Sequence, residues 1–283
     1  MGKNSSIEWT HHTFNPWWGC TKVSPGCEHC YAETWAKRVG AKVWGATKKR
    51  RFFTENHWGE PLKWNAGAAE DGQRKRVFCA SMADVFEARA DLDPWRKKLW
   101  ALIATTPWLD WLLLTKRPQN IAERIPWTRE WPNNVWLGTT VEDQQRAMER
   151  LPVLLKFPAK YRFLSCEPLL GPIDLDPWTV RRPESLHQID WVIAGGESGT
   201  NARAMLPGWA RKLRDQCQDS GIPFHFKQWG HWAPVPAPKT ERAPIRGFWD
   251  EVTDAQIFME PKGKKVAGRQ LDGATWDQVP VTS

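Results

Sequence analysis

Seven short apolar runs recur along this chain, and most of them are followed by a stretch of helical character. Two runs, Trp111–Leu114 and Trp191–Ala194, are apolar on both faces, as strands of a helix-covered parallel sheet are. The predicted strands are Ser6–Thr10, Val77–Ser81, Trp111–Thr115, Val135–Thr139, Arg162–Cys166, Trp191–Ala194 and Pro223–Lys227. The predicted helices include Tyr31–Val39, Pro94–Thr105, Val141–Phe157 and Pro207–Ser220. We therefore expect an α/β fold of six or seven β-α units forming an open or closed parallel barrel, with a doubly wound sheet as the alternative.

Polar and ionisable side chains follow nearly every predicted strand. In parallel α/β folds the carboxyl ends of the strands share one edge, where active sites form. Helix capping would explain one such residue, but their recurrence favours an active-site rim. The candidates are Asp84, Lys116, Arg117, Thr140, Glu142, Glu167, Glu197 and Lys227.

Two segments interrupt the repeating pattern. Gly40–Arg76 is too long for a simple connection and carries two basic runs, Lys48–Phe53 and Arg74–Arg76. Basic residues beside aromatic ones suit a nucleic-acid strand, although a solvated loop has the same composition. The segment after Gly230 is rich in proline, glycine and charge. We expect a barrel over residues 1–230 with an insertion at 40–76, and a C-terminal appendage or lid over 231–283.

The overall charge bears on the class of partner. Lysine and arginine number 40 and aspartate and glutamate 32, a net charge of +8, which favours an anionic partner such as nucleic acid. The 21 tryptophans could stack on bases, but most are expected to pack in the core or at its rim. No apolar window is long enough for a membrane span and no signal-peptide core begins the chain. We expect a cytoplasmic protein with no membrane partner.

Three of the six cysteines, Cys20, Cys27 and Cys30, lie on one short stretch. Three thiolates can hold a metal or an iron–sulfur cluster, and a four-iron cluster on three ligands leaves one iron open. A zinc site completed by His11, His12 or His29 is the main alternative. The stretch follows the first predicted strand and precedes a helix, which favours the cluster. The other three, Cys79, Cys166 and Cys217, are expected to be small buried residues.

The cysteine stretch resembles the cluster loop of radical S-adenosylmethionine (SAM) enzymes. Asn15, Pro16 and Gly19 before Cys20 are similar to the lead-in of the spore photoproduct lyase type. The spacing between the cysteines, six residues and then two, departs from the usual three and two. Further segments resemble the phage-borne three-cysteine-motif family, regarded as radical SAM-like. They are Ile7–Thr10, Ser81–Phe86, Leu114–Pro118, Trp136–Glu142, Ser165–Leu170, Gly195–Gly199, Phe226–Gly230 and Gly268–Gly273.

The resemblance implies a fold, two cofactors and roles for individual residues. The fold is a partial (β/α)6–7 barrel of the TIM-like, radical SAM type. Cys20, Cys27 and Cys30 would hold a [4Fe–4S] cluster whose open iron binds SAM, and SAM cleavage would yield a 5′-deoxyadenosyl radical. Asp84 is the candidate for the SAM amine, since the Gly195–Glu197 motif follows the wrong strand for that role.

The remaining rim residues receive roles on the same basis. Thr140 and Glu142 would meet the ribose or methionine end of SAM, and Lys116 or Arg117 its carboxylate or a substrate phosphate. Glu167, Glu197 and Lys227 would face the substrate as catalytic residues.

Two functions follow from these expectations. The first is a radical SAM enzyme that modifies or repairs a nucleic-acid base or nucleotide, with an external electron donor as its partner and a partner protein as a further candidate. The alternative is a zinc-binding, nucleic-acid-binding protein without redox catalysis. It explains the charge and the cysteines but not the many carboxylates, which would repel phosphate.

Overall fold

The computed structural model describes residues 5, 7–127, 130–179, 188–199, 201–238 and 244–281. The chain forms two compact units, each built from segments far apart in sequence. The first unit comprises Met1–Ser24, Ala32–Thr139 and Val153–Arg162. The second comprises Pro25–Tyr31, Thr140–Pro152 and Phe163–Ser283.

The main sheet has seven strands that follow one another in chain order. The strands are β1 (His12–Thr13), β2 (Lys75–Cys79), β3 (Leu109–Thr115), β4 (Val135–Thr140), β5 (Arg162–Cys166), β6 (Trp191–Gly195) and β7 (Phe224–Gln228). The pairings within each unit are parallel. A doubly wound sheet would reverse its strand order at a switch point. The unbroken order is that of a partial β/α barrel and confirms the predicted fold class.

Six of the seven predicted strands lie within two residues of their observed ends, but the first is wrong. Residues 7–10 form a turn, and Ser6 lies outside the described residues. The Thr10 amide donates to Ile7 O, and the Thr10 hydroxyl donates to Arg76 O. These bonds satisfy Thr10 without a strand partner. The first strand is instead the two-residue β1, which pairs with Val77 and Phe78.

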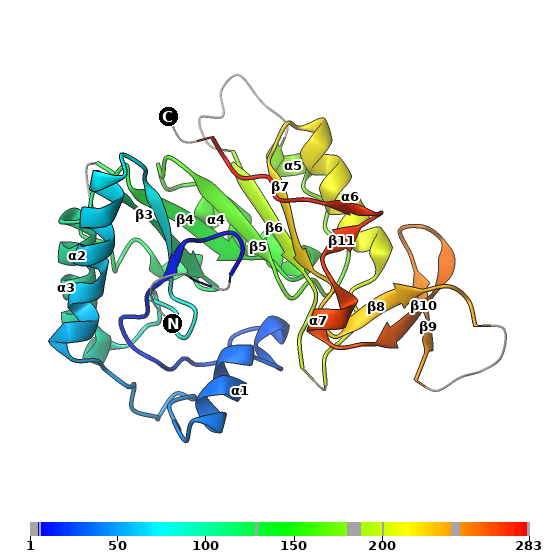
Figure 1. Cartoon of the computed structure of the whole chain (residues 1–283), viewed down its shortest axis with the longest axis horizontal. Coiled ribbons are helices and arrows are strands. Elements are labelled where there is room, and N and C mark those ends of the chain that lie inside the picture. The colour runs from blue at the N-terminus through cyan, green and yellow to red at the C-terminus, as the bar shows by residue number, and fades with distance from the viewer. Residues whose placement is uncertain are drawn as a thin grey trace. The chain divides into compact units, whose positions relative to one another are not determined.

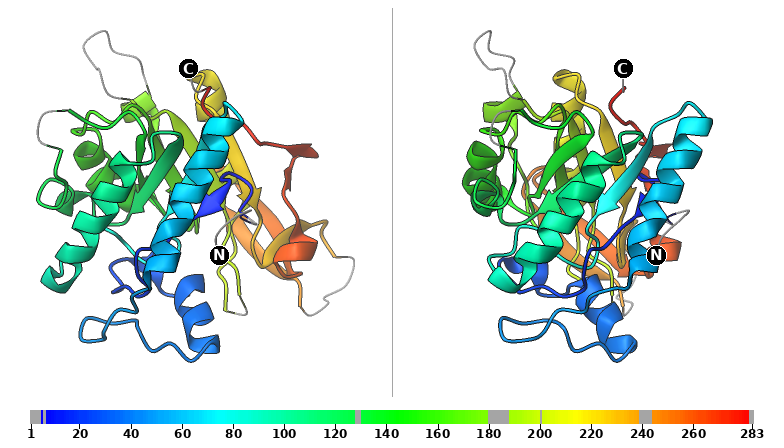
Figure 2. Two further views of the ribbon diagram at one scale, coloured as in Figure 1. Left: turned by 60° about the vertical axis from the view of Figure 1, so that its left-hand side comes forward. Right: turned by 90° about the vertical axis from the view of Figure 1, so that its left-hand side faces the viewer.

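The first unit contains β1 to β4 and several helices. The helices are α1 (Tyr31–Arg38, whose first residue belongs to the second unit), α2 (Glu55–Glu70), α3 (Asp93–Ala104) and the short η2 (Ala90–Leu92) and η3 (Pro118–Asn120). α2 packs on β2 and β3, and its Trp58 stacks on Trp95 of α3. Figures 1 and 2 show α2 and α3 as neighbours. Trp111, Leu112 and Trp136 are fully buried in the strands that the helices cover.

About half of the predicted insertion at 40–76 is regular structure. It contains all of α2 and the start of β2, and the chain before α2 and between α2 and β2 is irregular. The buried face of α2 is Trp58, Pro61, Trp64 and Ala68. This spacing of three to four residues is helical. The interpretation as an insertion missed it because Gly59, Pro61 and Gly67 interrupt the stretch.

The second unit contains β5, β6, β7 and several helices, of which α6 packs on β6 and β7. The helices are η1 (Pro25–Cys27), α4 (Gln144–Leu154, whose last two residues belong to the first unit), α5 (Asp176–Thr179) and α6 (Pro207–Asp219). Val192 and Ile193 of β6 pair with Phe224 and His225 of β7. α6 begins at its predicted residue. α4 is shorter than predicted, because the Asp143 carboxylate caps its first turn by accepting from the Arg146 amide, 2.8 Å.

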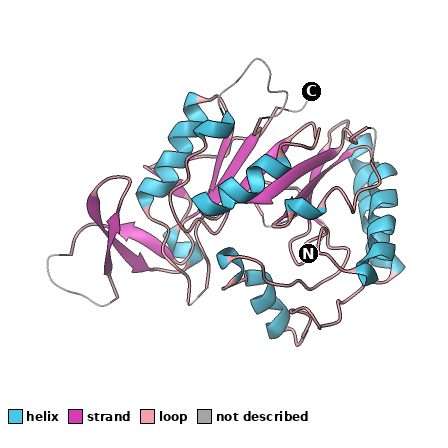
Figure 3. Cartoon of the chain, turned by 180° about the vertical axis from the view of Figure 1, so that it is seen from behind, coloured by secondary structure: helices cyan, strands magenta, loops and turns pink. Residues whose placement is uncertain are grey.

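The chain after β7 forms small antiparallel pieces of the second unit. β8 (Trp232–Val235), β10 (Ala255–Pro261) and β9 (Arg246–Asp250) form a three-stranded sheet in that order (Figure 3). It is followed by α7 (Lys264–Ala267) and the pair β11 (Gln270–Leu271) and β12 (Ala274–Thr275). Trp232 and Met259 form a core cluster with Ala202 and Leu206. The domain boundary near residue 230 stays a prediction.

Within the described ranges, no helix combines the length and apolar character needed to cross a membrane. Ten of the 21 tryptophans are buried, and eight more are half-buried. This agrees with the expectation that most of them pack in the core or at its rim.

Candidate metal and substrate site

The segment leading into Cys20 is bound to the chain that follows β2. Asn15 Oδ1 accepts from the Met82 amide, 2.7 Å, and its Nδ2 donates to Ser81 Oγ, 3.0 Å. The Gly19 amide donates to Met82 O, 3.0 Å. Asn15 and Gly19, two residues of the lead-in motif, therefore hold Cys20 beside the residues after β2.

No other residue can replace Gly19 unless the surrounding backbone and side chains rearrange. Its φ is +116°, outside the range that other residues adopt readily. A Cβ here would lie 2.4 Å from Val43 O and 2.7 Å from Arg50 Cδ. The glycine before Cys20 is thus required by its backbone conformation and by the close approach of a distant segment.

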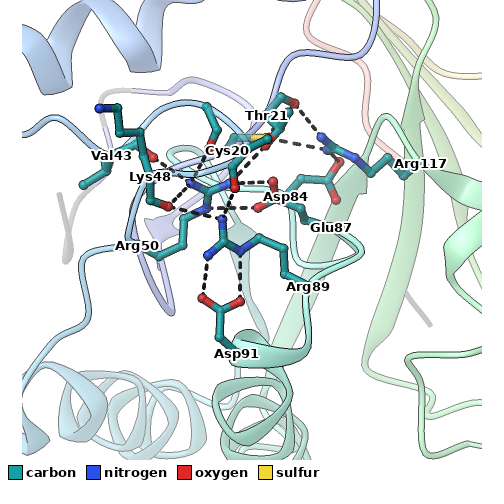
Figure 4. Close-up of polar contacts among 12 residues, drawn as sticks. Cys20, Thr21, Val43, Lys48, Arg50, Asp84, Glu87, Arg89, Asp91 and Arg117 are labelled. Carbon is teal, nitrogen blue, oxygen red and sulfur yellow. Dashed lines mark hydrogen bonds and ion pairs between the residues drawn. The ribbon is translucent and has the colours of Figure 1, made fainter.

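Cys20 lies against a guanidinium group (Figure 4). Arg117 Nη1 is 3.6 Å from Cys20 Sγ and 2.8 Å from Asp84 Oδ2, and Nη2 donates to Thr21 O. Burial raises the pKa of Cys20 to about 12, although Arg117 acts in the opposite direction. A metal that binds this sulfur must therefore displace a proton.

The Asp84 carboxylate organises this corner of the first unit. Oδ1 accepts from Thr115 Oγ1, 2.8 Å, and from the Phe86 amide, 3.0 Å. Oδ2 accepts from the Lys116 amide, 3.1 Å, and from Arg117. With four donors on one buried carboxylate, the contacts favour positioning of Arg117 over direct binding of an amine.

Arg50 and Glu87 form a buried ion pair next to this corner. Their side chains are 0% and 4% exposed, and two guanidinium nitrogens of Arg50 reach the carboxylate at 3.1 and 2.6 Å. Arg50 also donates to Val43 O, 2.9 Å, and to Thr21 Oγ1, 3.1 Å. Removing one partner of such a pair costs about 3–5 kcal/mol. Arg50 thus ties the irregular segment after α1 to the cysteine stretch.

Most residues of the two basic runs contact other residues of the first unit. Besides the buried Arg50, Arg51 lies over the Trp18 ring at 4.7 Å, and Phe52 stacks on Trp95 at 4.4 Å. Arg74 makes two bonds to Asp110. Lys48 and Lys49 remain exposed. The sequence left these runs open between contact with a nucleic-acid strand and a solvated loop. The contacts of these arginines and aromatics are made within the unit, and the nucleic-acid role of the runs stays a prediction.

In the second unit, Glu197 joins the other part of the cysteine stretch. His29 Nδ1 lies 3.0 Å from Glu197 Oε2, and Arg203 binds the same carboxylate through Nε at 2.9 Å. Arg203 also donates to Glu28, 3.0 Å. Burial would raise the pKa of Glu197, but the hydrogen bonds from Arg203 and His29 outweigh it and lower that pKa. Glu197 is therefore an ionised anchor for the stretch between Cys27 and Cys30.

Glu142 supports the same stretch from another direction. Its side chain is fully buried and accepts from Arg150 Nη1, 2.7 Å, and from the Gly26 amide, 3.3 Å. Arg150 Nη1 also donates to the carbonyl of Thr140, 2.7 Å. Thr140 and Glu142 therefore share one arginine, beside the residue that precedes Cys27.

Glu167 pairs with Lys227 across the ends of β5 and β7. Lys227 Nζ is 2.7 Å from Glu167 Oε2, and Gln228 Nε2 is 3.1 Å from Oε1. Burial opposes ionisation of Glu167, but the nearby Lys227 charge outweighs it and lowers the pKa. Gly196 allows this edge to close, since a Cβ there would lie 1.9 Å from Trp229 O.

Each unit therefore brings its strand ends to its own part of the cysteine stretch. In the first unit Cys20, Asp84 and Arg117 meet. In the second, Glu197 contacts His29 and Glu142 contacts Gly26, while Glu167 and Lys227 form a separate pair. Sequence reasoning placed Arg50 in a basic run and missed three other residues of these networks, because nothing in their spacing linked them to distant partners: Glu87, Arg150 and Arg203.

All six cysteines are free thiols in two groups. Cys20, Cys27 and Cys30 are half-buried, whereas Cys79, Cys166 and Cys217 are buried, as predicted for them. Among the described residues, no three or more histidine, cysteine or acidic side chains surround one metal position. Three half-buried cysteines, with a cationic hydrogen-bond donor at one of them, are a donor set that either iron or zinc accepts.

Comparison with known proteins gave one family match and several similar structures. A family model described as "Protein of unknown function (DUF5131)" matches residues 4–280. No curated protein matches the chain. A double mutant of spore photoproduct lyase with bound AdoMet and dinucleoside spore photoproduct is 13% identical, over 90% of this chain and 72% of that one, with a TM-score of 0.44. Spore photoproduct lyase complexed with dinucleoside spore photoproduct is 11% identical, over 92% and 71%, with a TM-score of 0.45.

Proposed function

We propose that this chain, which belongs to the family described as "Protein of unknown function (DUF5131)", is a radical SAM-like enzyme. Cys20, Cys27 and Cys30 would be the protein ligands of a [4Fe–4S] cluster. The observation that carries the proposal is the division of the cysteines. Three half-buried thiols lie on the stretch after β1, and the three outside it are buried. In a β/α fold this stretch is at the edge where active sites form.

The bound cluster and SAM would supply the electron transfer and hydrogen abstraction. The chain's own residues would position these groups. Arg117 places positive charge at Cys20 and is itself held by Asp84. Glu197, through His29, and Glu142, through Gly26, hold the stretch around Cys27 in place. Thr140 and Lys116 are retained as candidates for SAM contacts.

The substrate class is proposed to be a nucleic-acid base or a nucleotide. The net charge of +8 favours an anionic ligand. Lys227 is the candidate for contact with an anionic group, and Glu167 holds its ammonium at 2.7 Å. We retain Glu167, Glu197 and Lys227 as candidate substrate-facing residues, with an external electron donor as the required partner.

A zinc site is the second candidate, and one contact favours it. Histidines that bind a metal commonly donate their other ring nitrogen to a carboxylate. His29, between Cys27 and Cys30, is bonded through Nδ1 to Glu197, which is this arrangement. In contrast, His11 Nδ1 is occupied by the Arg76 amide, and His12 stacks on Trp64.

Metal content and SAM cleavage test the proposal together. The protein would be purified without oxygen, reconstituted with iron and sulfide, and assayed for 5′-deoxyadenosine after addition of SAM and dithionite. We expect about four irons per chain, as the cluster type implies, and release of 5′-deoxyadenosine. Cys20→Ala, Cys27→Ala and Cys30→Ala should each lose both.

The buried cysteines are matched controls. Cys79→Ala, Cys166→Ala and Cys217→Ala make the same chemical change and should retain iron and SAM cleavage. A colourless protein with one tightly bound zinc and no SAM cleavage would reject the proposal in favour of the second candidate. Equal iron loss in both cysteine groups would reject the ligand assignment.

A further inference from the structure

We infer that the pocket lined by Lys42, Trp44 and Lys48 is a docking site for single-stranded nucleic acid. One unpaired base would stack on Trp44, and the adjoining phosphates would contact Lys42 and Lys48. The inference rests on the proposed function, since it names where the substrate strand is held.

The pocket lies in the first unit between α1 and the chain that follows it. Its volume is about 450 Å³, within the usual range for small-ligand sites. Its lining comes from the second half of α1 and from the segment that returns beside it. The lining residues are Glu33, Lys37, Gly40, Ala41, Lys42, Val43, Trp44 and Lys48.

The walls of the pocket are held by backbone contacts. Gly40, at φ +75°, ends α1, and the Ala41 amide bonds back to Ala36 O at 2.8 Å. The far wall is anchored by buried Arg50, which donates to the carbonyls of Val43 and Lys48 (Figure 4). A rigid wall loses little conformational freedom on binding, which favours affinity.

The charge of the pocket selects an anion. Its single carboxylate, Glu33, is already paired with Lys37 at 2.7 Å and with Lys22 at 3.2 Å. Lys42 and Lys48 are exposed, and within the described part of the chain neither ammonium has an ion-pair partner. Two unpaired ammonium groups at one pocket suit successive phosphates.

The half-buried Trp44 favours single-stranded nucleic acid over a duplex as the ligand. Trp44 lines the pocket together with Lys42 and Lys48, and an aromatic side chain beside basic ones is the composition of a base-stacking platform. Only an unpaired base presents its face to a side chain, so we infer a single strand and not a duplex. The Gly45 amide donates to Cys20 O, 2.9 Å, so the residue after Trp44 is bonded to the first proposed cluster ligand.

A second groove in the same unit does not share the excess of positive charge that favours an anion in the pocket at Trp44. It has a volume of about 870 Å³ and lies beside β1 and α2. Two acidic residues, Glu60 and Asp71, balance Lys63 and Lys75 at its rim. Charge therefore distinguishes the pocket at Trp44.

Fluorescence anisotropy with labelled 12-nucleotide oligothymidine and oligouridine tests the inference on the full chain. Lys42→Gln/Lys48→Gln should weaken binding about tenfold or more at 100 mM salt and reduce the slope of log affinity against log salt by about 1.4, which is 0.7 for each lost phosphate contact. Trp44→Ala should weaken binding about tenfold and leave the salt slope unchanged, because stacking carries no counterion release.

Lys63→Gln/Lys97→Gln is the matched control, since both lysines are exposed on helices of the same unit. It should bind like the wild type. Equal weakening by the control, or stronger binding of a 12-base-pair duplex, would overturn the inference. So would no binding by the wild type.

SAM cleavage by the wild type, measured without oligonucleotide, separates this inference from the proposed function. Cleavage without oligonucleotide binding would overturn the pocket inference and leave the enzyme class standing. Lysine-dependent binding without cleavage would support the pocket and remove the proposed enzyme function.

Discussion

At the scale of single residues, Arg117 places a positive charge beside one of the three clustered cysteines, Cys20. Its guanidinium lies between a buried carboxylate and a thiol, 2.8 Å from Asp84 and 3.6 Å from Cys20 Sγ. A positive donor at a cluster sulfur stabilises the more negative, reduced cluster. Asp84 prevents the guanidinium from turning away.

Arg117→Gln should therefore lower the midpoint potential of the reconstituted cluster. We expect a fall on the order of 60 mV, about tenfold in a one-electron equilibrium constant, measured by redox titration followed by electron paramagnetic resonance. Arg74→Gln is the control, since Arg74 also binds a buried carboxylate, Asp110, but no cysteine. An unchanged potential in Arg117→Gln would show that this hydrogen bond does not reach the cluster.

At the scale of elements, Asp272 joins two pieces of the second unit. It lies between β11 and β12 and binds Arg211 at 2.7 Å and Arg214 at 2.5 Å, both on α6. The hydrogen bond from Arg211 and that from Arg214 outweigh partial burial and lower the pKa of Asp272 to about 2. The charged form is thus favoured in the folded state.

This lowered pKa sets a pH window for stability. Because the folded pKa lies below the unfolded one, Asp272 stabilises the fold above about pH 4 and loses this effect as pH falls toward 2. Asp272 is partly exposed, so we expect about 1 kcal/mol at most. Urea unfolding of the wild type and Asp272→Asn should differ at pH 6 and converge near pH 2. A difference that persists at pH 2 would contradict this account.

At the scale of the whole molecule, the cysteine stretch belongs to both compact units. Cys20 is in the first, and Cys27 and Cys30 are in the second. Each part has its own network, built on Arg117 and Asp84 in one and on Glu197 and Glu142 in the other. A metal held by these cysteines, as proposed, would bind the folded chain and not the unfolded one, so its binding energy would add to the stability of the folded chain.

Removal of the metal should therefore lower the thermal midpoint of unfolding. We expect a fall of roughly 5–10 °C, the effect of about 2.7 kcal/mol on a chain of this size, measured by differential scanning calorimetry before and after chelation. Metal-free Cys20→Ala should unfold near the metal-free wild type and gain nothing from reconstitution. A chelation effect as large in Cys20→Ala as in the wild type would place the metal elsewhere.

The sequence by itself determined the fold class and most of the strands. Runs such as Trp111–Leu114 are apolar on both faces, and only a sheet covered on both sides buries both. The sequence also showed the grouping of three cysteines, because Cys20, Cys27 and Cys30 lie close together along the chain. Patterns of this kind depend on neighbours in the chain, so they survive without knowledge of the tertiary structure.

Only the tertiary structure decided which charged residues serve the site. Arg50 belongs to a basic run but is fully buried on Glu87, whereas Lys42, outside that run, is exposed at a pocket. Arg203 belongs to no sequence motif, and yet its guanidinium donates a hydrogen bond to Glu197. Charge shows that a side chain needs a counterion or water, but the identity of its partner depends on the packing of segments distant in sequence. That is why polar residues at the strand ends could be found in the sequence, whereas their pairings could not; their role as an active-site rim stays a prediction.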